Sequence, residues 1–80
     1  MKVSVECYQG SVTVNVNPNK NSFSFNGFNF TLNVEEGNKY IYVTIKGSDW
    51  ADPLKTLKLS NKGDLTTYVT KAVQWISYNV

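Results

Sequence analysis

The fold is decided by residues 22–34, which read SFSFNGFNFTLNV. Apolar and polar residues alternate on both sides of the central Asn-Gly, with the period of two that is typical of half-buried β-strands. Asn-Gly is the strongest short signal for a β-hairpin, because a type I′ turn needs a positive φ at both central positions. A turn centred there pairs apolar residues with apolar residues, namely Phe25 with Phe28 and Phe23 with Phe30.

The alternation continues towards both ends of the chain. On the amino-terminal side the apolar positions are Val3, Val5, Cys7, Val12, Val14 and Val16, and on the carboxy-terminal side they are Ile41, Val43 and Ile45. Turns centred on residues 9–10 and 36–37 keep apolar residues opposite one another, with Cys7 facing Val12 and Leu32 facing Ile41. A slip by one residue would mix the two faces, so the three registers support one antiparallel meander.

The pattern changes after residue 46. Residues 47–53 read as a loop, and residues 55–59 read as a further short strand. From residue 65 onward the apolar positions follow helical spacing, and Asp64 stands where a helix N-cap is expected. The sequence therefore predicts a helix over roughly residues 64–78.

The whole chain, residues 1–80, is interpreted as one domain of 9.0 kDa. We predict an α+β fold in which a curved antiparallel β-meander of five to six strands is followed by one C-terminal α-helix packed on its concave face. Six strands at ~4.8 Å spacing would span ~29 Å, whereas a helix with its side chains is ~10–12 Å wide. Either the sheet curls into a partial barrel around the helix, or two copies pack their uncovered faces together. We expect a curled sheet, either as a self-contained monomer or as a homodimer.

Composition excludes several kinds of chemistry. All eight basic residues are lysines, six residues are acidic, the formal net charge is +2, and there is no His and a single Cys. A disulfide framework, a zinc finger and a His-based catalytic site are therefore excluded. Cys7 is predicted to be a buried and inert core residue, and Glu35, Glu36, Asp49 and Asp52 are assigned to turns rather than to a metal site. We expect no enzyme activity, no cofactor and no metal.

The cellular location can also be predicted from the sequence. No stretch approaches the ~18 apolar residues of a membrane span, and the opening residues Met1-Lys2-Val3-Ser4 do not resemble a signal peptide. A cytoplasmic location without membrane contact is therefore expected. Abundant Asn and Lys without Arg indicates an AT-rich genome such as that of a phage or mobile element, which would place the protein in the host cytoplasm.

The outward face of the sheet is the candidate binding surface. It combines Tyr with Ser, Thr and Asn, a composition that suits ordinary solvent-facing strands and is also typical of adaptable binding surfaces. The residues predicted to contact a macromolecule are the aromatic anchors Tyr8, Tyr40, Tyr42 and Trp50, and the lysines Lys39, Lys46, Lys55 and Lys58.

One family resemblance lies in the carboxy-terminal half. From Tyr40 to Trp75 the order is a strand, the loop Ser-Asp-Trp-Ala-Asp-Pro at residues 48–53, a strand end at residues 57–60 and an amphipathic helix. This resembles the positive-cofactor-four family of single-stranded-DNA-binding transcriptional coactivators. The resemblance implies a curved sheet followed by one helix, dimerisation through that helix, and DNA contacts at Tyr40, Tyr42, Lys46 and Lys58.

Three functional hypotheses follow, in order of preference. The first is a non-enzymatic module that binds single-stranded nucleic acid, because aromatic rings stack bases while cations follow the phosphates. The alternative is a small inhibitor that binds and blocks a host enzyme or defence complex, as an anti-CRISPR protein does. The third is a structural or assembly protein.

Overall fold

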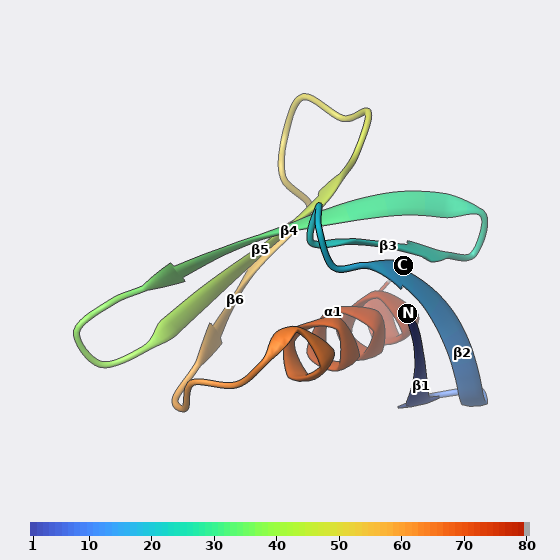
Figure 1. Cartoon of the computed structure of the whole chain (residues 1–80), viewed down its shortest axis with the longest axis horizontal. Helices are drawn as coiled ribbons and strands as arrows, with labels where there is room; N and C mark the ends of the chain where they lie inside the picture. Colours follow the sequence, from blue (N-terminus) through green and yellow to red (C-terminus); the bar gives the residue numbers. More distant parts are fainter. Residues whose placement is uncertain (80) are drawn as a thin grey trace.

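The computed structural model describes residues 1–79. Six strands and one helix follow each other in the order β1 (Lys2–Cys7), β2 (Gly10–Asn17), β3 (Ser22–Phe25), β4 (Phe28–Glu36), β5 (Ile41–Gly47), β6 (Lys55–Leu59) and α1 (Leu65–Asn79). The strands form one antiparallel sheet in sequence order, from β1 at one edge to β6 at the other (Figure 1). The predicted α+β meander with a C-terminal helix is confirmed.

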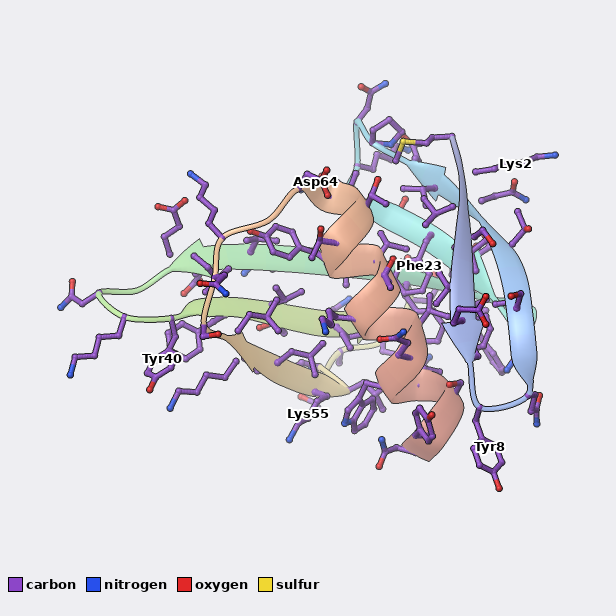
Figure 2. The ribbon with its side chains drawn as sticks, turned by 90° about the horizontal axis from the view of Figure 1, so that it is seen from below. Lys2, Tyr8, Phe23, Tyr40, Lys55 and Asp64 are labelled. Carbon is purple, nitrogen blue, oxygen red and sulfur yellow. The ribbon has the colours of Figure 1, made fainter. Side chains whose placement is uncertain are left out.

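The sheet curls into a half-barrel, and α1 lies in its concavity (Figure 1). This curvature resolves the mismatch between a wide sheet and a narrow helix, because it brings β1 round to stand beside α1 (Figure 2). The helix and this edge strand are joined by a hydrogen bond in which Gln74 Nε2 donates to the carbonyl of Glu6, 3.0 Å away. The edge of β1 is thus covered by the helix, which is one way in which proteins protect an edge strand.

The core lies between the concave face and α1, and a single copy of the chain closes it. Eleven strand residues and five helix residues are buried there: Val3, Val5, Val14, Val16, Phe23, Phe25, Phe30, Leu32, Ile41, Val43, Ile45, Tyr68, Val69, Ala72, Val73 and Ile76. Val43, Ile45, Val69, Ala72 and Val73 have no exposed surface at all. Covering this apolar face therefore requires no second copy.

The central hairpin has the predicted register and turn. Phe25 pairs with Phe28 and Phe23 pairs with Phe30. Asn26 and Gly27 have φ values of 52° and 80°, both positive as a type I′ turn demands. The rings of Phe23 and Phe30 stack across the two strands, with centroids 5.4 Å apart.

The registers predicted for the two other hairpins are wrong. Val12 faces Val5 rather than Cys7, a slip of two residues, because the first turn consists of residues 8–9 and Gly10, with φ 114°, already belongs to β2. Leu32 faces Ile45 rather than Ile41, a slip of four, because residues 37–40 form the second turn. Both slips are even, so every side chain keeps its predicted face.

Two core assignments also need correction. Cys7 is half-buried and lies opposite Gly10, so it is not the buried core residue that was expected. Phe28 was expected to face the core, but 56% of its surface is exposed because it starts β4 beside the turn, beyond the cover of the helix.

The helix begins at Leu65, directly after Asp64, which acts as the predicted N-cap. Its Oδ1 atom accepts hydrogen bonds from the backbone N–H of Thr67 at 2.9 Å and from the Thr67 hydroxyl at 3.0 Å. These bonds stabilise the carboxylate, so the backbone N–H of Thr67 first and its hydroxyl second lower the pKa of Asp64 below its ordinary value. An N-cap of this kind fixes where α1 starts.

Candidate macromolecule-binding surface

Tyrosine and lysine side chains meet on the outward face of β5 and β6. Tyr42 on β5 lies directly opposite Lys58 on β6 in the strand pairing. The Lys58 ammonium also lies 4.0 Å from the centroid of the Tyr40 ring, which is a cation–π arrangement. One lysine therefore lies beside both Tyr40 and Tyr42, which were predicted as contact residues.

The tight turn before β5 contains Tyr40 and lies against the ring of Tyr42. Its backbone is closed by a hydrogen bond from the N–H of Gly37 to the carbonyl of Tyr40, 2.8 Å away. A Cβ atom on Gly37 would come within 2.8 Å of Cε2 of Tyr42, so this ring rests against the turn where only glycine leaves room. Tyr42 nevertheless keeps 37% of its surface exposed, which leaves it accessible to a ligand.

Two more lysines extend this region. Lys39 is exposed in the same turn, next to Tyr40, and Lys46 lies on the outward side of β5, where its Nζ donates to the carbonyl of Gly47 at 3.1 Å. We call this region the Tyr–Lys surface, and it consists of Lys39, Tyr40, Tyr42, Lys46 and Lys58. An acidic residue, Glu35, borders this surface, since it faces Tyr42 across β4 and β5.

The structure does not bring the other three predicted contact residues to this surface. Tyr8 lies in the β1–β2 turn, 72% exposed, with its ring edge-on to Tyr78 at 5.5 Å. Figure 2 shows Tyr8 and Tyr40 at opposite ends of the molecule. Lys55 lies opposite Ile45, which places it on the helix side of β6. The site predicted from the sequence is therefore split.

Trp50 is the third predicted contact residue that does not belong to the Tyr–Lys surface. It packs against Gly47 and lies edge-on to the buried Phe30, with ring centroids 5.9 Å apart. With 40% of its surface exposed, Trp50 anchors the loop after β5 rather than standing free as a contact residue.

A hollow of about 500 Å³ lies beside the Tyr–Lys surface on the outward face. Its lining is mostly neutral and polar and consists of Asn15, Val16, Asn17, Lys20, Ser22, Phe23, Ser24, Asn29, Thr31, Ser48 and Asp49. The loop after β5 forms one wall and is fixed to β4, because the N–H of Ser48 donates to the carbonyl of Asn29 at 2.9 Å. The single lysine and the single aspartate leave the lining without net formal charge.

A second hollow, of about 400 Å³, lies where β6 leads into α1. It is lined by Lys58, Leu59, Ser60, Asn61, Lys62, Gly63, Thr67 and Lys71, and thus by three lysines and no acidic residue. The Lys62 ammonium forms an ion pair with Glu36 at 2.6 Å. The hydrogen bond that Lys62 donates to Glu36, and then the negative charge of Glu36, raise the pKa of Lys62 above its ordinary value.

Lys62 and Lys71 were not among the contact residues predicted from the sequence. Positions 58, 62 and 71 share no helical or strand periodicity, because they lie on a strand, in a connection and on a helix. The signal that was present is a bias in distribution, since Lys55, Lys58, Lys62 and Lys71 are four of the eight lysines and all lie after residue 54.

The fold and these surfaces define an α+β half-barrel protein with one hollow on the outward face of the sheet and a second between β6 and α1. No protein-family model, curated protein or solved structure matches the chain. Within residues 1–79, no three His, Cys, Asp or Glu residues gather into a cluster that could hold a metal ion. The one helix described is too short and too polar to cross a membrane.

Proposed function

We propose that this protein is a cytoplasmic, non-enzymatic module that binds single-stranded nucleic acid through the Tyr–Lys surface. The observation that carries the proposal is the Lys58 ammonium, 4.0 Å from the Tyr40 ring and opposite Tyr42 in the sheet. Aromatic rings for bases and cations for phosphates are thus interleaved on one rigid face, which is the combination found in single-strand binding surfaces.

The affinity expected from this surface is modest and sensitive to salt. Stacking of one base on an aromatic side chain contributes about 1–3 kcal/mol. Each phosphate neutralised on a single strand contributes about −0.7 to the slope of log K against log salt, so three lysines give a slope of about −2. The formal net charge is only +2, so we do not expect tight non-specific binding.

The test is fluorescence anisotropy with labelled oligo(dT) across a salt series. We expect binding at low salt that weakens linearly on a log–log plot, and a loss of affinity in Tyr42→Ala. Tyr8→Ala is the matched control, because it removes an even more exposed tyrosine at the other end of the molecule. No binding at low salt, or equal losses in the two variants, would overturn the proposal.

A second candidate function is inhibition of a host enzyme or defence complex by direct contact. The neutral hollow of about 500 Å³ favours it, because its amide and hydroxyl lining fits the side chains of a protein better than a chain of phosphates. Ser24→Arg would fill this hollow from the outward face. If a captured bacterial enzyme is still bound and inhibited by the Ser24→Arg variant, the hollow is not its contact site.

A third candidate is a structural or assembly role, for which self-association is the relevant measurement. The apolar side of α1 is already buried against the sheet, so a homodimer through that side of the helix would have to open the core. We therefore expect sedimentation to give a 9.0 kDa species at all concentrations. A mass that rises with concentration would support a homodimer and an assembly role.

A further inference from the structure

Three lysines from three separate segments converge on the hollow between β6 and α1. Lys58 comes from β6, Lys62 from the connection and Lys71 from the second turn of the helix. The remaining lining adds the hydroxyl of Ser60 and the amide of Asn61, together with Thr67, whose hydroxyl already donates to Asp64. Every charged group that lines this hollow of about 400 Å³ is therefore a cation.

Only one of these three charges is compensated within the chain. Lys62 forms the single ion pair found within residues 1–79, with Glu36. The Lys58 ammonium lies against the Tyr40 ring, and no carboxylate pairs with Lys71 in the part of the chain described. Bringing like charges together has an electrostatic cost, which an anion bound in the hollow would reverse.

The attraction comes from the lysines and not from the end of the helix. Two backbone donors in the first turn of α1 are engaged, since the N–H of Thr67 donates to Asp64 Oδ1 and the N–H of Tyr68 donates to the Asp64 carbonyl at 3.1 Å. The N–H of Gly63 likewise donates to the buried Tyr68 hydroxyl at 3.0 Å. The groups left free to meet an anion are thus mainly ammonium groups.

We propose that this hollow binds a phosphate group, and that in the bound complex the phosphate belongs to the nucleic-acid strand that lies on the Tyr–Lys surface. The second half of this proposal rests on the proposed function. Lys58 lines the hollow and also contacts Tyr40, so a strand that stacks a base near Tyr40 reaches the hollow with its adjacent backbone. A polyvalent anion with oxygen acceptors on several sides suits donors from three directions.

The hollow is tested first without any nucleic acid. Pyrophosphate is titrated into isotope-labelled protein, and the amide signals of Ser60, Asn61 and Gly63 are followed by NMR. We expect saturable shifts at these residues and a dissociation constant about fivefold weaker in Lys71→Gln, the value for one exposed charged contact. Lys2→Gln removes an exposed lysine from β1, far from the hollow, and is the matched control.

A second measurement separates this inference from the proposed function. Oligo(dT) binding is compared in the wild-type protein and in Lys71→Gln, and we expect the salt slope to become shallower by about 0.7 in the variant. If oligo(dT) binds but this slope is unchanged, the strand does not reach the hollow. If pyrophosphate binds and oligo(dT) does not, the phosphate site stands and the nucleic-acid proposal falls.

Two outcomes would overturn the proposed phosphate site itself. It is overturned if pyrophosphate shifts are spread evenly over all lysine-bearing segments, or if Lys71→Gln and Lys2→Gln weaken binding equally. Thermal melting of each variant checks folding, and Lys71 and Lys2 are both exposed, so neither substitution removes a core contact.

Discussion

The indole ring of Trp50 packs directly against the backbone of Gly47, at the point where β5 ends. A Cβ atom on residue 47 would overlap this ring, so glycine is required here by the space that Trp50 occupies. The backbone at Gly47 does not have a positive φ, and the N–H of Trp50 closes the turn by donating to the carbonyl of Gly47 at 2.9 Å. The contact seals one end of the core over Phe30.

Gly47→Ala should therefore destabilise the protein by about 1–3 kcal/mol, the usual cost of overpacking. The clash needs the indole, so the cost of Gly47→Ala should shrink when Trp50→Ala is already present. Urea unfolding of the wild type, both single variants and the double variant measures this coupling. Strictly additive losses would show that the two residues do not act on each other.

Neighbouring residues of β5 should differ sharply in their effect on stability, because they face opposite sides of the sheet. Ile45 is completely buried, so Ile45→Ala should cost about 2–5 kcal/mol and leave such a small domain largely unfolded. Thr44 faces outward and forms a hydrogen bond with the Thr56 hydroxyl at 3.0 Å, so Thr44→Ala should cost about 1 kcal/mol or less. Similar losses in thermal or urea unfolding would contradict the assignment of faces.

The Asp64 cap should make stability depend on pH in acid. Because folding lowers the pKa of this carboxyl, its contribution is present above the ordinary value of 3.8 and is lost as pH falls through the lower folded value. Asp64→Asn keeps a good N-cap without a titrating group, so the melting temperatures of the two proteins should converge or cross below about pH 4. A difference that stays constant in that range would exclude a titrating cap. Asp64→Ala should melt at a lower temperature than both at neutral pH.

Two lysines of β6 offer a matched test of the binding face. Lys58 lies on the outward Tyr–Lys surface, whereas Lys55 lies on the helix side of the same strand. Each substitution with Gln removes one positive charge, so net charge changes equally in both variants. Lys58→Gln should make the salt slope for oligo(dT) shallower by about 0.7, and Lys55→Gln should leave it unchanged. Equal changes would mean that net charge alone, rather than this face, attracts the nucleic acid.

Much of the fold could be predicted from the sequence because alternation fixes which face a side chain takes. It does not fix the offset between strands, since moving a strand by two or four residues preserves the pattern. That is why Asn26-Gly27, whose turn type allows one geometry, gave the right register, while the other two turns were misplaced. Gly10 and Gly37 indicate that a turn is nearby, but they do not determine how many residues the turn contains.

The candidate site was only partly predictable, because its members come together through curvature and connections. Tyr42 and Lys58 could be placed on one face by counting along their strands. Lys55 was grouped with them although odd–even counting along β6 puts it on the other face. Lys62 and Lys71 join Lys58 only when the chain turns back from β6 into α1, a path that no local pattern describes.

The helix that fills the concavity is also the last of the seven elements to leave the ribosome. Until residues 65–79 have emerged, the apolar side chains on the concave face of the sheet have no helix to cover them. Productive folding of this sheet therefore waits for the synthesis of α1, and a ribosome that stalls before Leu65 leaves a sheet-forming chain whose apolar side is exposed to aggregation or to chaperones.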